Sequence, residues 1–265
     1  MTQSDTSHII LQAKQLKVGY TTSGTTTPVL DHVNLELHTG QLIGMIGING
    51  SGKSTLLRSL SGLQDLLDGE LLIDNLSHTS YTPEALAQKL SVVLTGQHIS
   101  KNLTVTELVS LGRQPYTNWL GKMTSADLKI IEDALISTDC YSLAHKKCYA
   151  LSDGQLQRVL IARALAQDTP LILMDEPLTH LDLHHKAALL KLLTQISKTK
   201  TKTILFSTHD IEHALPLCDQ MVVLQDSQVL MDTPQNLVDN GVFDTLFPHD
   251  NIRFNAQLKR FFIEN

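Results

Sequence analysis

The sequence predicts an α/β fold with a largely parallel sheet, and three observations carry that prediction. An apolar run at residues 42–46 leads through a glycine-rich turn into leucines at helical spacing. Later apolar runs, at residues 171–174, 203–207 and 221–224, alternate with a helical pattern, as in α/β proteins. Residues 98 to about 165 differ, because helical patterns dominate there. We therefore expect one α/β core that is interrupted by a helical insertion.

Local patterns predict the flanking elements. Residues 9–20 hold apolar side chains that indicate strands at a sheet edge, and the Thr-rich residues 21–27 indicate a loop. Alternating apolar and polar residues at 29–37 predict a half-buried strand. The other expected elements are a β segment at 69–74, a helix at 83–89, a strand at 90–95, capped helices at 104–113 and 125–136, a helix near 185–197 and a helical tail beyond Pro234.

The glycine-rich turn matches the pattern G-x-x-x-x-G-K-S/T. Its residues are Gly47, Ile48, Asn49, Gly50, Ser51, Gly52, Lys53, Ser54 and Thr55. Glycines let the backbone bend around an anion and present N–H groups and a helix N-terminus to phosphates. Lys53 supplies positive charge to the β- and γ-phosphates, and Ser54 can place its hydroxyl on Mg²⁺. An ordinary glycine turn before a helix is the alternative, but it leaves the full motif unexplained. The turn therefore predicts binding of a nucleoside triphosphate.

Composition narrows the class of protein. The 265 residues can bury a substantial core, and the net charge of -6, from 21 Lys and Arg against 27 Asp and Glu, argues against a nucleic-acid partner. The basic run at 198–202 indicates a solvated loop. Three widely spaced cysteines indicate a reducing compartment. We expect no signal peptide at residues 1–8, and no apolar stretch approaches the ~20 residues of a membrane span. Any membrane role must then come through another chain.

Paired carboxylates end one of the apolar strands. Asp175 and Glu176 follow residues 171–174, and an acid at the carboxyl end of such a strand sits beside the glycine-rich turn. Asp175 can hold Mg²⁺ there, and Glu176 can polarise an attacking water. The alternative is a strand that merely ends in acidic turn residues. The order of the two motifs favours a hydrolytic site.

A further segment resembles the LSGGQ signature of ABC ATPases. It reads Leu151-Ser152-Asp153-Gly154-Gln155 and precedes a helix through Arg163. Alone it is more simply a capped helix start, but its position after the glycine-rich turn and before Asp175 favours the signature. The resemblance implies that Ser152, Gly154 and Gln155 contact the ATP bound by a second protomer. Asp153 departs from the usual glycine. We expect its carboxylate to turn away from the nucleotide and to accept backbone N–H bonds at the helix start.

Single residues complete the resemblance in chain order. Tyr20 matches the aromatic that stacks on adenine, Gln97 the Q-loop glutamine, Asp182 the D-loop aspartate and His209 the switch histidine. The resemblance implies that Gln97, His209 and Lys53 take part in catalysis with Glu176. It also implies that Gln97 holds the metal with Ser54 and Asp175, and that Asp182 contacts ATP. Each residue alone has an ordinary explanation, such as a surface glutamine or a structural histidine. Their joint order supports the family.

Two stretches resemble one subgroup, the ATPases of importers for iron-siderophores, haem and cobalamin. They are residues 179–185 and residues 104–113 with Pro115 and Tyr116. The histidines at 180, 184 and 185 could suggest a metal site instead. Only Asp182 accompanies them, and adjacent histidines face different sides of a helix, so we expect no metal there.

The resemblance implies a single domain with a RecA-like ABC ATPase core, an antiparallel β subdomain and a helical subdomain. We expect the core in residues 1–97 and 166–265 and the helical subdomain in residues 98–165. Implied cofactors are ATP and Mg²⁺, and implied partners are a second copy, a membrane permease and, indirectly, an extracytoplasmic binding protein. The implied location is cytoplasmic, on the inner face of the membrane. A non-transport ABC ATPase acting on DNA or ribosomes would need a coiled-coil insertion, tandem domains or a basic face. If the chain were a nucleotide-dependent kinase or switch, its signature segment would be unexplained. The sequence does not identify the cargo, because this subunit does not contact it.

Overall fold

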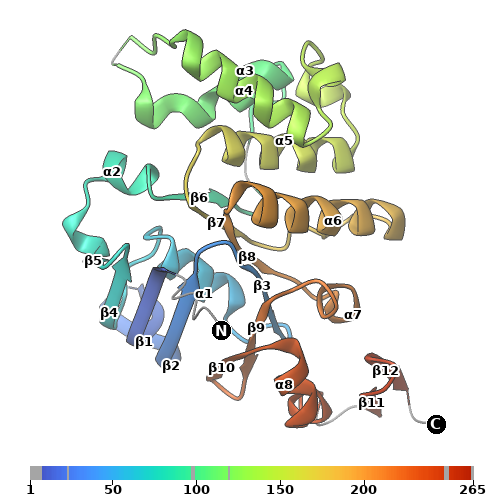
Figure 1. Cartoon of the computed structure of the whole chain (residues 1–265). Coiled ribbons are helices and arrows are strands. Elements are labelled where there is room, and N and C mark those ends of the chain that lie inside the picture. The colour runs from blue at the N-terminus through green and yellow to red at the C-terminus, as the bar shows by residue number, and fades with distance from the viewer. Residues whose placement is uncertain (1–7, 23, 97–98, 119, 248–250, 264–265) are drawn as a thin grey trace, which may run out of the picture.

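The computed structural model describes residues 8–22, 24–96, 99–118, 120–247 and 251–263. Within these residues the strands form a six-stranded, a four-stranded and a two-stranded sheet (Figure 1). The α-helices are α1 (Lys53–Leu60), α2 (Pro83–Ala87), α3 (Val105–Ser110), α4 (Ser125–Ser137), α5 (Asp153–Ala166), α6 (Leu183–Lys200), α7 (Ile211–Ala214) and α8 (Pro234–Asp239). Short 3-10 helices are η1 (His78–Ser80), η2 (Leu111–Tyr116), η3 (Tyr141–Leu143), η4 (Cys148–Ala150) and η5 (Val242–Asp244).

The six-stranded sheet has the order β10-β9-β3-β8-β7-β6. Its strands are β3 (Leu42–Gly47), β6 (Leu90–Val93), β7 (Leu171–Met174), β8 (Thr203–Ser207), β9 (Gln220–Gln225) and β10 (Gln228–Asp232). All pair in parallel except β10, which is antiparallel to β9. Every residue of β3, β7 and β8 is buried, which explains their continuous apolar runs. Because parallel strands end at one edge, the residues that follow β3, β7 and β8 meet there.

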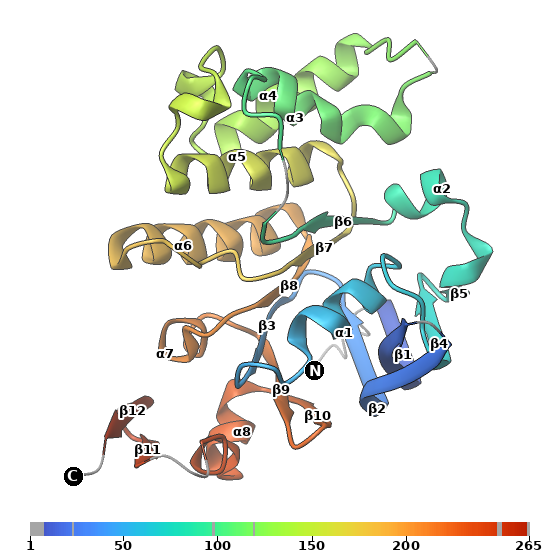
Figure 2. The same ribbon diagram turned by 180° about the vertical axis from the view of Figure 1, so that it is seen from behind.

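The four-stranded sheet is antiparallel and has the order β2-β1-β4-β5. It consists of β1 (Ile9–Thr22), β2 (Thr25–His38), β4 (Asp68–Ile73) and β5 (Leu76–Ser77). Helix α1 packs between this sheet and the parallel one (Figure 2), and its Leu56, Leu57 and Leu60 are fully buried in a cluster shared by both. The two sheets therefore hold α1 from both sides.

Helices α3, α4 and α5 pack on one another at one end of the molecule, and α6 lies between α5 and the parallel sheet (Figures 1 and 2). The buried Arg113 ties this layer together, because its Nε donates to Asp127 Oδ1 (2.9 Å) and its Nη1 to the Ala166 carbonyl (2.9 Å). Hydrogen bonds from Thr124, then from Arg113, lower the pKa of Asp127 to about 2. The subdomain boundary at residue 97 lies outside the described residues, and the division at 98–165 stays a prediction.

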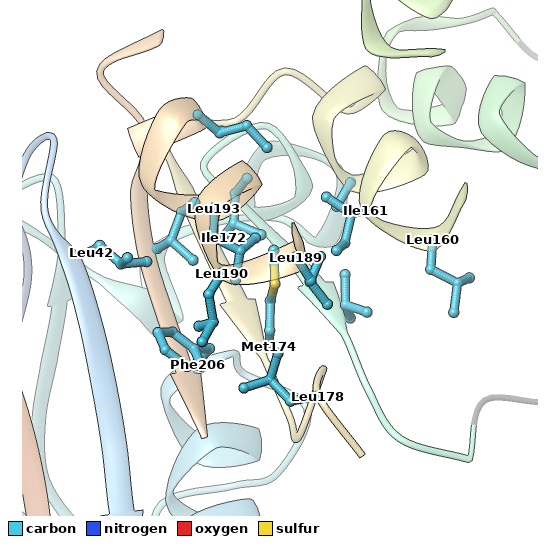
Figure 3. Close-up of a cluster of buried hydrophobic side chains, with 14 of the residues drawn as sticks. Leu42, Leu160, Ile161, Ile172, Met174, Leu178, Leu189, Leu190, Leu193 and Phe206 are labelled. Atoms are coloured by element: carbon cyan, nitrogen blue, oxygen red, sulfur yellow. The ribbon is translucent and has the colours of Figure 1, made fainter. Parts of the chain in front are cut away.

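Figure 3 shows the core between α6 and the sheet. Ile172 and Met174 of β7 and Phe206 of β8 form one cluster with Leu189, Leu190 and Leu193 of α6. Each is at most 3% exposed, and fully burying one such side chain contributes roughly 1.5–3 kcal/mol. The apolar contacts fix α6 on the sheet and so place the loop that precedes it.

Two predictions for the N-terminal region are wrong. Residues 9–20 belong to one strand that lies inside its sheet, because β1 pairs with both β2 and β4. Residues 21–27 are mostly strand rather than loop, since Tyr20 pairs with Thr27 and Thr22 with Thr25. Branching at Cβ makes threonine a good strand residue, which outweighs the low complexity of the segment.

Two predictions further along the chain are only partly right. The tail beyond Pro234 begins with the helical α8 and η5, but β11 (Ile252–Asn255) and β12 (Arg260–Ile263) then pair antiparallel. Phe243 packs on Phe254 and Phe254 on Phe261, with ring centroids 4.8 and 5.0 Å apart. The run at 198–202 is not all loop, because α6 continues to Lys200.

All three cysteines, Cys140, Cys148 and Cys218, are buried and form no disulfide. Burial raises the pKa of each thiol, to about 12 for Cys218. Among the described residues, no helix combines the length and the apolar character that a membrane crossing requires.

Candidate active site

The glycine-rich turn joins the end of β3 to the start of α1 and can only be built with glycine at two points. A Cβ at Gly47 would lie 2.6 Å from the Leu224 carbonyl oxygen. Gly52 has a φ of +98°, and a Cβ there would lie 2.7 Å from Val29 Cγ1. Both contacts are too short, so glycine is needed for the backbone to curve back toward the N-terminus of α1.

Lys53 points back into this curve. Its side chain is buried, and its Nζ donates to the carbonyl oxygens of Gly47 (2.8 Å) and Ile48 (3.1 Å). Burial lowers the pKa of Lys53, while the charges of Glu176 and Asp175 oppose that shift. Ser51 Oγ is also buried and has no hydrogen-bond partner among the described residues. The buried Lys53 amine supplies positive charge, and the buried Ser51 hydroxyl has a proton to donate. Both groups suit an anionic ligand.

The carboxylate of Asp175 is held by three hydroxyl groups. Ser54 Oγ and Ser207 Oγ donate to Asp175 Oδ1 (3.1 and 2.8 Å), and Thr95 Oγ1 donates to Oδ2 (3.2 Å). Asp175 is 4% exposed. The structure thus brings Ser54 and Asp175 together as the sequence predicts, and their oxygens are the ligands that Mg²⁺ prefers. The residues present fit that ion.

Glu176 and His209 also meet at this edge. His209 Nε2 lies 2.7 Å from Glu176 Oε1, and Thr179 Oγ1 donates to Oε2 (3.1 Å). Glu176 has a φ of +46°, in the left-handed region, and its backbone N–H donates to Ser207 Oγ (2.8 Å). Its side chain stays about a quarter exposed, so water can reach the carboxylate.

A cleft of about 280 Å³ opens over the turn. It is lined by Tyr20, Val29, Asn49, Gly50, Gly52, Lys53, Ser54, Thr55 and Glu176. Tyr20 is 48% exposed, and its hydroxyl lies 2.6 Å from Thr55 Oγ1, which fixes the ring at the rim. An exposed ring beside a donor-rich turn can stack on a flat ligand whose phosphates reach the turn.

The signature segment forms the N-terminus of α5. Ser152 Oγ accepts from the Gln155 N–H (3.3 Å), and Gln155 Oε1 accepts from the Ser152 N–H (3.2 Å), which makes a capping box. Asp153 is the first helical residue, so the expected capping by its carboxylate is wrong: Ser152, one residue earlier, holds the capping position. The exposed Asp153 charge still lies at the positive end of the helix dipole.

The signature packs against the D-loop of its own chain. A Cβ at Gly154 would lie 3.6 Å from Leu181 of the D-loop and 3.1 Å from the ring of His185, near the start of α6. The His185 N–H donates to Asp182 Oδ1 (2.9 Å), His185 Nδ1 lies 2.7 Å from the same oxygen, and these bonds lower the pKa of Asp182. Of the described residues that line the cleft, none belongs to the signature or the D-loop. The two halves of the predicted site therefore lie on separate surfaces of the chain.

Gln97 lies outside the described residues. The sequence interpretation missed three hydroxyls that hold the carboxylates, those of Ser207, Thr95 and Thr179. Ser207 lies two residues before His209, at the end of the strand beside β7, and the sequence carries no signal that β8 and β7 are neighbours.

A strand, a glycine-rich turn, a helix and an acid at the end of a nearby strand together define a P-loop nucleoside triphosphatase. A family model described as ABC transporter matches residues 30–179. The chain belongs to the ABC transporter family, and within it the chain is an ATPase.

Similar proteins cover most of the chain. The petrobactin import ATP-binding protein FpuD of Bacillus anthracis is 37% identical over 238 residues, which is 89% of this chain and 86% of that protein. The iron(3+)-hydroxamate import ATP-binding protein FhuC of Bacillus subtilis is 34% identical over 222 residues, 84% of this chain and 81% of that protein. The dimeric, post-hydrolysis ATP-binding cassette MJ0796, bound to ADP and Pi, superposes with a TM-score of 0.72 at 28% identity, covering 84% of this chain and 98% of that chain.

Proposed function

We propose that this chain is the ATP-hydrolysing subunit of an ABC importer for an iron-siderophore, haem or cobalamin. The observation that carries the hydrolytic part is that Lys53, Ser54, Asp175, Glu176 and His209 meet at one edge of the sheet. The cargo class is supported by the import functions for which the relatives are named.

The chain's own groups would hold the nucleotide in a fixed order. Tyr20 would stack on adenine at the rim, and the N–H groups of residues 47–55, with the Lys53 amine, would bind the phosphates. Ser54 and Asp175 would hold Mg²⁺, with Gln97 completing the set. When bound, Mg²⁺ neutralises negative charge on the phosphates.

Glu176 is placed to accept a proton from water. As the water oxygen attacks the γ-phosphorus, the bond between that phosphorus and the β-phosphate oxygen breaks and leaves ADP and phosphate. Thr179 and His209 hold the two carboxylate oxygens, so Glu176 presents a defined edge to the water. Positioning and charge supply most of the acceleration in such reactions.

A second copy of the chain would complete the site. Ser152, Gly154, Gln155 and Asp182 lie away from the cleft of their own chain and would cover the γ-phosphate held by the partner. ATP then joins the two copies, and hydrolysis releases them. The helical subdomain, residues 98–165, would pass this motion to a membrane permease from the cytoplasmic face. A binding protein on the far side of the membrane would deliver the cargo.

The hydrolytic role is tested with Glu176→Gln. Removing the charged acceptor should reduce ATP hydrolysis by about a hundredfold or more, as is typical for loss of a general base. ATP affinity should stay near wild type, and the protein should accumulate as an ATP-bound dimer in size-exclusion chromatography. Glu84→Gln, on the exposed face of α2, is the control. Wild-type hydrolysis by Glu176→Gln would contradict the role.

The cargo class needs a separate test. The chain is reconstituted with its permease in vesicles, and ATP-dependent transport of a labelled iron-siderophore, haem and cobalamin is compared. Transport of at least one supports the proposal. Transport of only an unrelated solute, such as a sugar, would overturn the cargo class and leave the ATPase role intact.

A further inference from the structure

Ser207 lies at the edge of the parallel sheet where the neighbouring strands β7 and β8 both end. It is the last residue of β8, and β8 pairs in parallel with β7, with Met174 opposite Phe206. Asp175 and Glu176 directly follow β7. Ser207 is 0% exposed, so its hydroxyl bonds to the protein rather than to bulk water.

The hydroxyl of Ser207 contacts both acidic residues at once. It donates its single proton to Asp175 Oδ1 (2.8 Å), and it accepts the backbone N–H of Glu176 (2.8 Å). A serine hydroxyl has one proton and two lone pairs, so both bonds can be satisfied together. One side chain therefore connects the Asp175 carboxylate, which Ser54 and Thr95 also hold, to the Glu176 backbone.

The second bond matters because the Glu176 backbone is in an unfavourable conformation. Its φ of +46° lies in the left-handed region, which is common for glycine but which L-residues other than asparagine and aspartate rarely adopt. Such a conformation persists only when surrounding contacts enforce it, and it directs the Glu176 side chain toward His209. The bond from the Glu176 N–H to Ser207 Oγ is one of those contacts.

The ordinary alternative is that Ser207 is a buried polar residue whose hydrogen bonds only satisfy its own hydroxyl. The same sheet contains an internal comparison. Ser91 on β6 is also buried, yet its Oγ has no hydrogen-bond partner among the described residues. This sheet thus tolerates a buried serine without partners, which makes the paired bonds of Ser207 a specific arrangement rather than a general need.

We propose that Ser207 is a positioning residue for ATP hydrolysis: through one hydroxyl it orients the Asp175 carboxylate toward Mg²⁺ and holds Glu176 in the conformation that presents its carboxylate to water. The proposal rests on the proposed function, because it acts through the roles assigned there to Asp175 and Glu176. Ser207 is not among the described residues that line the cleft, so we expect it to act only through Asp175 and Glu176.

The test is Ser207→Ala, compared with wild type, Ser91→Ala and Glu176→Gln in the full chain. Ser207→Ala should lower kcat by about tenfold to a hundredfold, the scale expected when a catalytic group is slightly misplaced, and should change KM far less. ATP affinity measured in EDTA should be unchanged, while the gain in affinity on adding Mg²⁺ should shrink. Ser91→Ala should match wild type in all three measurements, because its hydroxyl orients nothing.

Hydrogen exchange gives a readout that does not depend on activity. In Ser207→Ala the Glu176 amide loses its acceptor and should exchange faster, while in Ser91→Ala its exchange should stay the same. If Ser207→Ala keeps wild-type kcat and Mg²⁺ dependence while Glu176→Gln is inactive, the positioning role is wrong and the proposed function stands. If Glu176→Gln keeps wild-type kcat, the proposed function fails instead. Equal losses in Ser207→Ala and Ser91→Ala would show a general packing effect and overturn the proposal.

Discussion

Helix α1 follows Gly52, which has no side chain with which to cap it, whereas α5 follows Ser152, which closes a capping box with Gln155. Both N-termini are predicted to face phosphate, one in this chain and one across the dimer. The α5 cap consists of two hydrogen bonds between Ser152 and Gln155, of 3.2 and 3.3 Å. We therefore expect the α1 terminus to be preorganised for an anion, and the α5 terminus to stay satisfied within its own chain until a partner arrives.

The largest expected effect lies at the α1 terminus. Lys53→Ala removes the buried amine that we expect to bind the phosphates, so ATP affinity should fall by about a hundredfold or more. Binding of a fluorescent ATP analogue measures this, with Lys191→Ala on the exposed face of α6 as the control. Unchanged affinity in Lys53→Ala would remove the basis for treating α1 as the preorganised side.

An intermediate effect is expected at the α5 terminus. Ser152→Ala removes the cap and should cost about 1 kcal/mol of stability, a shift of roughly 2–4 °C in Tm for a chain of this size. In a Glu176→Gln background it should also weaken ATP-driven dimerisation. Thr82→Ala removes the comparable cap of α2 and serves as the control, which should lower Tm without affecting the dimer. Dimerisation that survives in Ser152→Ala would show that the cap hydroxyl has no role across the interface.

The smallest effect is expected at Asp153, beside that cap. Asp153→Gly removes a negative charge from the positive end of α5, a loss of about 0.3–1 kcal/mol that salt should reduce. Thermal denaturation at low and high salt measures it, with Asp153→Asn as a variant of equal size. ATPase activity should change by only a few-fold. A large rise in ATP-driven dimerisation would instead mean that the carboxylate faces the nucleotide.

The motifs were predictable because each is local in sequence. The turn at residues 47–55 and the acids after β7 depend on short runs with fixed spacing, and the structure brings Ser54 to Asp175 as expected. The hydroxyls of Ser207, Thr95 and Thr179 were not predictable, since serine and threonine take whichever partner the tertiary structure brings near. That β8 neighbours β7 is a fact of topology, so the bonds of Ser207 to Asp175 and Glu176 could not be inferred from spacing.

The predictions of the α5 cap and of the structure at residues 21–27 failed for a related reason. Ser152 and Asp153 are both good capping residues, and only the extended backbone of Ser152, with ψ of 161°, selects it. At residues 21–27, composition indicated a loop, but pairing with the preceding strand decided the outcome. In the tail, the aromatic rings of Phe243, Phe254 and Phe261 contact one another only after the chain has folded.

The burial of Cys140, Cys148 and Cys218 has a practical consequence for following the motions of this ATPase. The thiolate is the nucleophile that attacks thiol reagents, and burial both shields these three sulfurs and raises the pKa of their thiols. A cysteine introduced on the surface of α5 or beside the cleft would then react much faster than any native one. Fluorophores or spin labels can therefore be attached in the wild-type background, without first replacing the native cysteines, to measure how far the two copies approach each other when ATP binds.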